Sequence, residues 1–137
     1  YYTERDLVAI HEAMDRDLAL AGARVDAWLY CPHHPDGTVP EFRGACACRK
    51  PRPGMIRQAQ ERFSIDLANS VVVGDKLLDV GSAVEAGALG ILVRTGYGEK
   101  LVQDHGGQVP QAAFVAETLM EAVTWFLRRQ GHPRQTA

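Results

Sequence analysis

The most constraining feature of this sequence is an apolar strand that runs directly into a glycine and an acidic residue. Residues 70–73, Ser-Val-Val-Val, have the pattern of a buried strand, and Gly74-Asp75-Lys76 follows at once. Residues 77–86 then have the pattern of a helix, and residues 90–93 form a second apolar strand. Strands that alternate with helices in this way predict an α/β fold with a mostly parallel sheet.

The flanking segments extend this pattern. The chain opens with a helix that Thr3 and Asp6 can cap, and its apolar residues recur at helical spacing up to about residue 21. Residues 26–30, Asp-Ala-Trp-Leu-Tyr, have the pattern of a short strand. A second helix, opened by Pro53-Gly-Met, and a terminal helix present their apolar residues on one face; these are Met55, Ala59 and Phe63, then Leu119, Ala122, Val123 and Phe126. We find no repeat, and expect one domain over residues 1–137.

Composition excludes several classes of function. The formal net charge is −2 and the basic residues are spread along the chain, so the basic field of a nucleic-acid-binding protein is missing. No stretch approaches the roughly 20 apolar residues that cross a bilayer, and the charged start is not a signal peptide. We expect a cytoplasmic monomer, with neither nucleic acid nor a membrane as its partner.

Two pairs of metal-ligand residues flank one irregular loop. Cys31-Pro-His33 is followed, after twelve residues, by Cys46-Ala-Cys48, and residues 31–50 are too rich in Pro, Gly and Cys for a regular element. Three thiolates and one imidazole suit a tetrahedral zinc ion. Four protein ligands leave no position for a catalytic water, so the sequence predicts a structural zinc.

Two alternatives remain for this loop. His34 competes with His33 as the fourth ligand. The cysteines could also be free buried thiols beside unrelated histidines, although their place in a polar, irregular loop weakens that interpretation. Three cysteines confined to residues 31–48 make a poor disulfide framework, which leaves metal as the better explanation.

Asp75 is the candidate magnesium ligand. A carboxylate directly after a buried parallel strand lies at the carboxyl end of the sheet, where open α/β folds bind their ligands. Asp79, one helical turn later, can reach the same side, and Mg²⁺ favours few carboxylates together with waters and phosphate oxygens. The alternative is that Asp75 only caps the helix that begins at Leu77, and spacing does not choose between the two.

Arg49 and Lys50 directly follow the last zinc ligand. A metal that orders the loop would also fix these two cations at the start of the next helix. There a guanidinium offers a planar fork for phosphate oxygens, and an ammonium offers a compact charge. Two solvated surface charges are the simpler alternative, which the nearby zinc ligands weaken.

Four segments together resemble the D-glycero-D-manno-heptose 1,7-bisphosphate phosphatases of the haloacid dehalogenase (HAD) superfamily. They are residues 30–37, 46–54, 73–79 and 92–96, and the resemblance covers nearly the whole chain. It implies a Rossmann-like HAD fold with an inserted zinc loop. It also implies the following roles: zinc ligands Cys31, His33, Cys46 and Cys48; Lys50 as the lysine that stabilises the phosphoryl group and the nucleophile; Arg49 as a substrate contact; Asp75 as the Mg²⁺ ligand; Lys76 beside it in the substrate site; and Asp79 completing the acidic motif.

The resemblance further implies a reaction on a small-molecule sugar phosphate. Such enzymes use an aspartate nucleophile that forms a phospho-aspartyl intermediate, with a second aspartate two residues later as general acid and base. Magnesium and the lysine offset the charge of the transferred phosphoryl group. The expected activity is removal of the C7 phosphate of the heptose bisphosphate, in the synthesis of lipopolysaccharide core heptose.

The sequence departs from the family pattern at its beginning. The D-x-D-G strand and the strand ending in Thr or Ser do not precede the first helix, and the sole D-x-D motif, Asp15-Arg-Asp17, lies inside the helical pattern. Residues two apart on a helix point about 200° from each other and cannot converge on one ion. By resemblance we expect a further segment upstream, an uncovered apolar edge of the sheet without it, and no turnover by this chain alone.

Two other functions remain open. Histidinol phosphatases resemble the chain in the zinc loop and in Arg49-Lys50-Pro51, but their loop is typically shorter. A noncatalytic, zinc-stabilised binding module would explain the missing nucleophile. It would leave Asp75 and the Arg49-Lys50 pair without a purpose.

Overall fold

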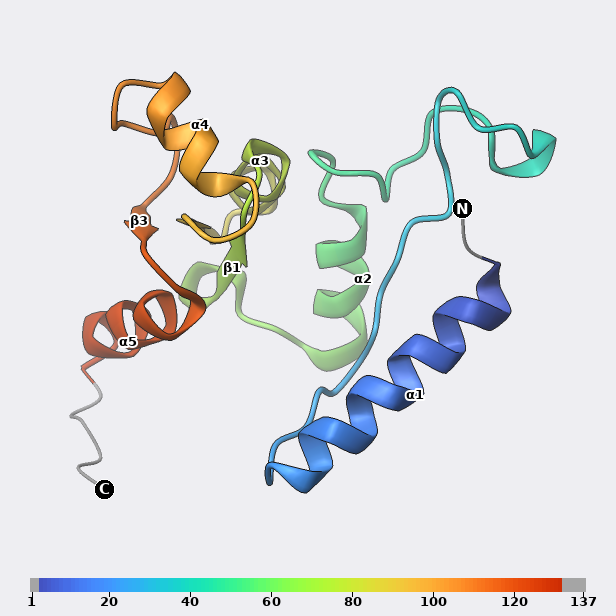
Figure 1. Cartoon of the computed structure of the whole chain (residues 1–137), viewed down its shortest axis with the longest axis horizontal. Coiled ribbons are helices and arrows are strands. Elements are labelled where there is room, and N and C mark those ends of the chain that lie inside the picture. The colour runs from blue at the N-terminus through green and yellow to red at the C-terminus, as the bar shows by residue number, and fades with distance from the viewer. Residues whose placement is uncertain (1–2, 132–137) are drawn as a thin grey trace. The chain divides into compact units, whose positions relative to one another are not determined.

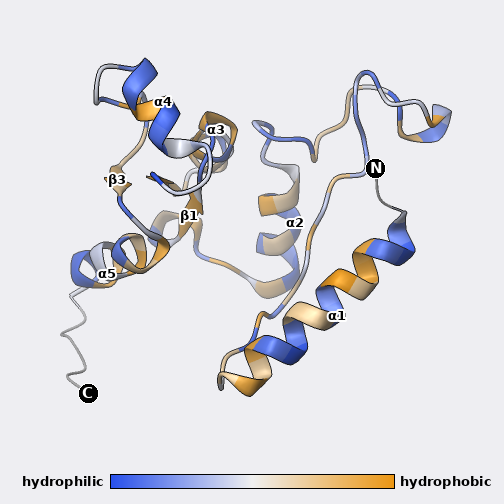
Figure 2. Cartoon of the chain, in the orientation of Figure 1, coloured by the Kyte–Doolittle hydropathy of each residue, from blue (hydrophilic) through white to orange (hydrophobic). Residues whose placement is uncertain are grey.

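The computed structural model describes residues 3–131 and divides the chain into two compact units, residues 1–30 and 31–137. The first unit is built on helix α1 (Glu4–Leu20). Thr3 caps this helix as predicted, because the Asp6 amide donates to the Thr3 hydroxyl and the Thr3 amide donates to the Asp6 carboxylate. Apolar and polar residues alternate along α1 (Figure 2), and no described residue of the helix is buried.

The segment after α1 is not the strand that the sequence predicts. Residues 26–30 pair with no strand in the part of the chain that the structure describes. Instead the Trp28 ring stacks on His11 with 4.8 Å between ring centroids, and the Trp28 indole N–H donates to Asp15. The Tyr30 hydroxyl donates to Glu4. Side-chain contacts with α1 fix this segment, and the ladder hydrogen bonds that define a strand are not made.

The second unit contains a three-stranded parallel sheet in the order β1-β2-β3. Its strands are β1 (Val71–Gly74), β2 (Leu89–Val93) and β3 (Phe114–Ala116). In register, Val73 lies opposite Ile91, and Ile91 lies opposite Phe114. The predicted α/β class is confirmed. The outer side of β1 pairs with no other strand among residues 3–131, so β1 is an edge strand there.

Helices cover both faces of this sheet (Figure 1). Because side chains alternate along a strand, Ile91 and Val93 face α5 (Leu119–Arg129), whereas Leu92 between them faces α3 (Leu77–Ala86). A third apolar cluster joins α2 (Gly54–Phe63) and the 3-10 turn η2 (Leu67–Asn69) to the end of α3. The α3 bounds agree with the prediction at both ends.

Several elements differ from the sequence prediction. Helix α4 (Gly98–Asp104) and strand β3 were not predicted, and the zinc loop contains a 3-10 turn η1 (Pro40–Phe42). The predicted face of α5 is partly wrong: Ala122 is fully buried, but Leu119 is 60% exposed and Val123 is 39% exposed. Phe126 packs on the sheet as predicted, and Trp125, which was not predicted to lie on this face, packs there beside it. None of the described helices is long and apolar enough to span a membrane.

Candidate functional site

The four predicted zinc ligands converge in the second unit. One donor atom from each of Cys31, His33, Cys46 and Cys48 lies within 4.8 Å of all the others. The three sulfurs are 3.0–3.4 Å apart, and His33 Nδ1 lies 3.8 Å from the Cys31 sulfur and 3.6 Å from the Cys48 sulfur. Sulfurs held about 2.3 Å from one tetrahedral ion lie roughly 3.8 Å apart, so these three would have to move apart by less than 1 Å to bind zinc. The donor types and their convergence on one point fit a zinc site.

The electrostatics of the thiols also favour a cation. A hydrogen bond with Cys31 and burial raise the pKa of the Cys48 thiol to about 12. Burial acts to raise the pKa of the Cys46 thiol as well, but hydrogen bonds from Cys48, Cys31 and the backbone outweigh it, so that pKa is lowered. Without a cation the Cys46 and Cys48 thiols therefore do not ionise over the same pH range. A divalent cation would supply the charge that lets all three bind as thiolates.

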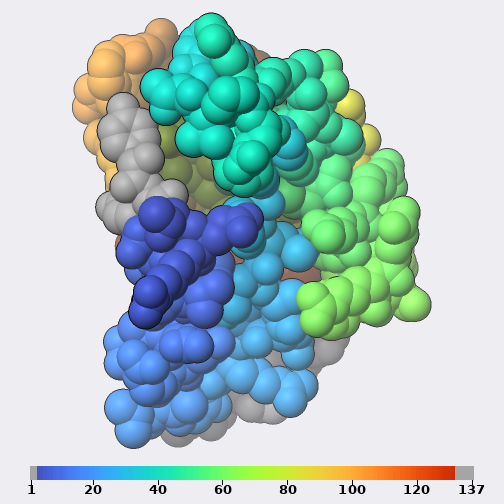
Figure 3. All heavy atoms as spheres, turned by 90° about the vertical axis from the view of Figure 1, so that its right-hand side faces the viewer, coloured from blue at the N-terminus to red at the C-terminus, as the bar shows by residue number. Residues whose placement is uncertain are grey.

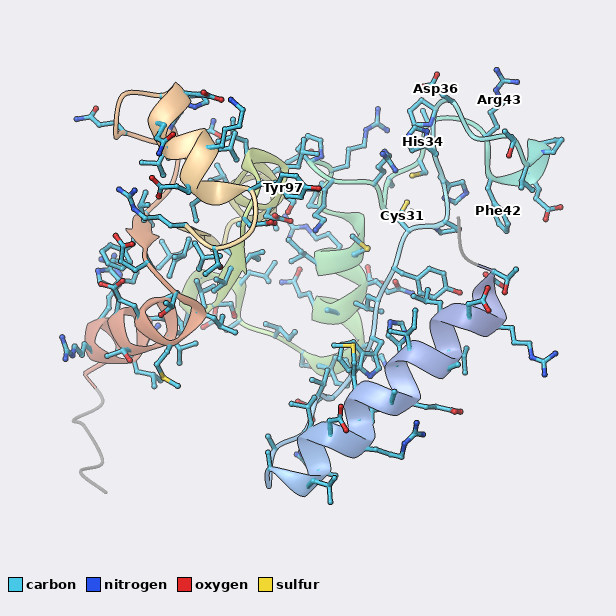
Figure 4. All side chains as sticks on the ribbon, in the orientation of Figure 1. Cys31, His34, Asp36, Phe42, Arg43 and Tyr97 are labelled. Carbon is cyan, nitrogen blue, oxygen red and sulfur yellow. The ribbon has the colours of Figure 1, made fainter. Side chains whose placement is uncertain are left out.

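His34, the competing ligand, lies outside this cluster. Its Nδ1 accepts a hydrogen bond from the Asp36 amide, and its backbone amide donates to the Phe42 carbonyl. Figure 4 shows His34, Asp36 and Phe42 on the part of the loop that extends beyond Cys31. The Phe42 ring stands edge-on to His33 at 6.2 Å between centroids, which braces the imidazole in the cluster. Figure 3 shows the loop, in teal, at the molecular surface.

Arg49 is tied to the ligand cluster at two points. Its backbone amide donates to the Cys46 sulfur at 3.3 Å, and its guanidinium Nη1 donates to the His33 carbonyl at 2.9 Å. The side chain is half-buried. Any ligand that orders the cysteines would thus also fix the direction in which Arg49 points.

Lys50 is brought to the carboxyl end of the sheet by Asp79. The Lys50 ammonium forms an ion pair with Asp79 Oδ1, and Asp79 Oδ2 accepts from the Lys76 amide at 3.1 Å. Asp79 is buried in the first turn of α3. A side chain at Gly74 would overlap the Asp79 carboxylate, so glycine at the end of β1 is what permits this approach. Both oxygens of Asp79 are therefore engaged by the protein itself.

Asp75 lies where the sequence predicts, directly after β1 and half-buried. One of its oxygens, Oδ2, accepts from the backbone amide of Tyr97 at 3.1 Å. Gly96, with φ of +66°, lies so close that a Cβ would overlap this oxygen. Because β1 and β2 are parallel, the loop after β2 and Asp75 meet at the same edge of the sheet. Oδ1 of Asp75 makes no hydrogen bond among the described residues and could hold a cation.

Tyr97 is the functional candidate that the sequence interpretation missed. The Lys76 ammonium lies 4.4 Å from the centroid of the Tyr97 ring, so residues 75, 76 and 97 form one cluster. The signal in the sequence is Gly96-Tyr97-Gly98 shortly after an apolar strand. Two glycines around an aromatic residue at that point indicate a tight loop at the ligand-binding edge.

Asp15 and Asp17 both lie inside α1. Asp15 accepts the Trp28 indole hydrogen bond, and no group of three potential metal ligands among the described residues includes either aspartate. This geometry agrees with the interpretation that they are not a paired nucleophile and acid.

A comparison with protein families finds a match to the family described as HAD-hydrolase-like over residues 47–122. Among curated proteins, D-glycero-beta-D-manno-heptose-1,7-bisphosphate 7-phosphatase of Yersinia pestis is 48% identical over 96 residues, which are 69% of this chain and 51% of the relative. The protein of the same name from Bordetella bronchiseptica is 44% identical over 113 residues, 82% of this chain and 58% of the relative. The chain spans about half the length of the curated relatives it matches.

Solved structures give a similar result. The D,D-heptose 1,7-bisphosphate phosphatase of B. bronchiseptica, determined as a complex with magnesium and phosphate, has a TM-score of 0.76 and 41% identity. The match covers 91% of this chain and 65% of that one. A HAD-like phosphatase from Mesorhizobium loti has a TM-score of 0.75 and 26% identity, and the match covers all of this chain and 62% of that one.

Proposed function

Because the chain belongs to the HAD-hydrolase-like family, we propose that it is the metal- and phosphate-binding part of a sugar-phosphate phosphatase. The substrate we propose is D-glycero-D-manno-heptose 1,7-bisphosphate, from which the enzyme removes the C7 phosphate. Relatives at 44–48% identity carry the name of this activity. The product would serve the synthesis of bacterial surface glycans.

The single observation that carries the proposal is the gathering of Lys50, Asp75 and Lys76 around the buried Asp79. Asp79 engages the Lys50 side chain and the Lys76 backbone, and Asp75 is the residue just before Lys76. The half-buried Asp75 carboxylate has one oxygen without a hydrogen bond among the described residues, and Asp79 links Lys50 to the backbone of the next residue, Lys76. A carboxylate and two lysines gathered in this way suit a divalent ion and a phosphoryl group together.

Each of these residues has a distinct part in the proposed chemistry. Asp75 Oδ1 would hold Mg²⁺, which when bound offsets the negative charge on the phosphate oxygens. Lys50, aimed by Asp79, would stabilise the phosphoryl group as it is transferred, and Arg49 would contact the sugar phosphate through its guanidinium. The structural zinc would act indirectly, by fixing the loop from which Arg49 and Lys50 extend.

We infer that none of the aspartates in this candidate site is the nucleophile, because Asp75 and Asp79 already have other proposed parts. We expect an aspartate on a D-x-D-G strand, which attacks phosphorus and forms the phospho-aspartyl intermediate, and a second aspartate that protonates the leaving oxygen and later activates water. The free edge of β1 is where such a strand could pair.

The test is magnesium-dependent phosphate release from D-glycero-D-manno-heptose 1,7-bisphosphate, measured for the 137-residue chain and for a version extended upstream through a D-x-D-G strand. Histidinol phosphate is the competing substrate, and Asp75→Asn in the extended version is the matched variant. We expect activity on the heptose only in the extended version, and its loss in Asp75→Asn with zinc content unchanged. Cys46→Ser should instead lose zinc.

The other outcomes contradict different parts of the proposal. Turnover by the short chain would return Asp15 and Asp17 as candidates. Preference for histidinol phosphate would overturn the proposed substrate. No phosphate release by either version from either substrate would favour a noncatalytic binding module.

A further inference from the structure

Asp75 and Lys76 are adjacent in sequence, carry opposite charges and are both needed by the proposed function. Two such side chains on neighbouring residues can form an ion pair with each other, which would occupy the Asp75 oxygen and neutralise the ammonium. Among the described residues, neither one forms an ion pair. The extended backbone at Lys76 directs the two side chains to opposite sides, and a contact on the far side would keep the ammonium there.

Tyr97 contacts both residues through different groups. Its backbone amide donates to Asp75 Oδ2 at 3.1 Å, and the face of its ring receives the Lys76 ammonium at 4.4 Å from the centroid. The ring itself is largely in solvent, with 65% of Tyr97 exposed. Burial of an apolar side chain does not explain this tyrosine.

The loop that carries Tyr97 is fixed from both sides. On the side before Tyr97, Gly96 lies against the Asp75 carboxylate. On the other side, Tyr97 is the N-cap of α4, and Glu99 in the first turn of that helix forms an ion pair with Arg94. Arg94 also pairs with Glu117 at the end of β3. The aromatic ring is thus presented from a braced loop at the carboxyl edge of the sheet. In Figure 4 Tyr97 lies beside the start of α4.

We propose that Tyr97 is a positioning residue that holds Lys76 away from Asp75, so that the ammonium stays available to phosphate and the Asp75 oxygen stays available to magnesium. The ring offers the ammonium an attraction that is comparable to a surface ion pair but consumes no carboxylate. The Lys76 ammonium would then be partly desolvated and positioned toward the phosphate before that group binds. The role assigned to Tyr97 rests on the proposed function and adds to it a residue that neither the zinc ligands nor the acidic motif includes.

The first measurement reads the geometry directly. The side-chain resonances of Lys76 are followed by NMR in the zinc-loaded chain, in the wild type, Tyr97→Phe and Tyr97→Leu. We expect upfield ring-current shifts of the Lys76 Hε protons in the wild type and in Tyr97→Phe, and their loss in Tyr97→Leu. The wild type and both variants keep the backbone amide that donates to Asp75, so differences among them report on the ring alone. Lys76 shifts that are the same with and without the ring would overturn the proposal.

The second measurement reads the function with MgCl₂ and inorganic phosphate as probes. Calorimetric titration is expected to give about two- to fivefold weaker phosphate binding for Tyr97→Leu than for the wild type, and binding close to wild type for Tyr97→Phe. In a Lys76→Met background the Tyr97→Leu change should have no further effect, because the partner of the ring is gone. Additive losses in the double variant would overturn the positioning role.

Failure of this inference is distinguishable from failure of the proposed function. If the wild type binds Mg²⁺ and phosphate and Tyr97→Leu binds them equally well, only the role of Tyr97 is wrong. If the wild type binds neither, the proposed function is overturned, and the role of Tyr97 with it.

Discussion

Asp79 is a buried carboxylate that holds together two lysines of the proposed site. It is 6% exposed, receives the Lys76 amide on one oxygen and pairs with Lys50 on the other. Lys50 lies 29 residues away in sequence, so only the fold brings the two together. An asparagine at this position would lose the negative charge, and its NH₂ group would face one of the two donors, the Lys50 ammonium or the Lys76 amide.

We therefore expect Asp79→Asn to lower the free energy of unfolding by about 1–3 kcal/mol, since the half-exposed Lys50 can be partly rescued by water. Urea denaturation measures the change. Asp104→Asn is the matched control, because it removes an exposed pair with Lys100 and should cost less than about 0.5 kcal/mol. Equal losses in the two variants would contradict the organising role of Asp79.

Glu99, in the first turn of α4, should make the free energy of unfolding depend on pH through its ion pair with Arg94. A hydrogen bond from Arg94, and a second from Gln103, hold the pKa of Glu99 below its ordinary value of 4.5. A carboxyl group with a depressed folded-state pKa contributes stability above its unfolded-state pKa and loses it as the pH falls through the folded value.

Glu99→Gln should therefore be less stable than the wild type at pH 7, and the difference should shrink as the pH falls below about 4.5. Urea denaturation from pH 7 to pH 3 measures both curves. Glu61, exposed and without an ion pair among the described residues, provides the control Glu61→Gln, whose curve should run parallel to the wild type. A constant gap between Glu99→Gln and the wild type would show that Glu99 acts through packing alone.

At the scale of elements, the loop between β2 and α4 is defined by how closely it approaches Asp75. Gly96 has a positive φ of +66° and no room for a Cβ beside the Asp75 carboxylate, whereas Gly87, which ends α3 with φ of +84°, has open space around it. The two glycines therefore share the backbone conformation but differ in their surroundings.

Both alanine substitutions should lower the free energy of unfolding by roughly 1–2 kcal/mol because of the left-handed backbone. Gly96→Ala should lower it by roughly a further 1–3 kcal/mol because its Cβ overlaps Asp75. Thermal or urea denaturation compares the two. Gly96→Ala should also weaken magnesium binding, while Gly87→Ala should not. Identical stability losses would mean that the loop can move away from Asp75 without cost.

Elements with strong local signals were predictable from the sequence, and those that depend on partners were not. Helix α3 has apolar spacing and a clear end at Gly87, and its predicted bounds agree with the structure. The three-residue strand β3 and the seven-residue helix α4 are too short to show a period. Residues 26–30 have strand-like composition, but a strand also needs a neighbour, which the pattern within one segment does not reveal.

The candidate site divides in the same way. The four predicted zinc ligands are close in sequence, so their spacing alone indicated a metal, and Asp75 followed from its place after a strand. The resemblance favoured His33 over His34, but the turn that binds His34 to Asp36 and leaves His34 out of the cluster was not predictable from spacing. The contacts of Tyr97 with residues 75 and 76 span more than 20 residues, and no local pattern encodes them.

At the scale of the whole molecule, the division into two compact units has a direct consequence for folding. Residues 1–30 contain one helix with no buried residue, and segments below about 40 residues rarely fold alone. The second unit contains the sheet, both helical layers and all four predicted zinc ligands.

We expect a fragment of residues 31–137 to keep one zinc per chain and a cooperative urea transition, and a peptide of residues 1–30 to be largely unstructured. Circular dichroism and zinc analysis measure both. A matched fragment of residues 51–137, which removes the zinc loop, controls for the loss of chain length and should bind no zinc. Unfolding of the 31–137 fragment would instead support the single domain that the sequence predicts.

The closed base of the zinc loop also bears on how proteins of this kind can diverge. The Cys31 and Cys48 sulfurs lie 3.0 Å apart, so the chain leaves and returns at nearly one point. Lengthening a loop that is already closed costs little, about 0.6 kcal/mol for each doubling. Insertions and deletions in residues 34–45 can therefore accumulate without shifting Arg49 or Lys50. The surface of this loop can thus vary while the residues proposed to bind phosphate keep their positions.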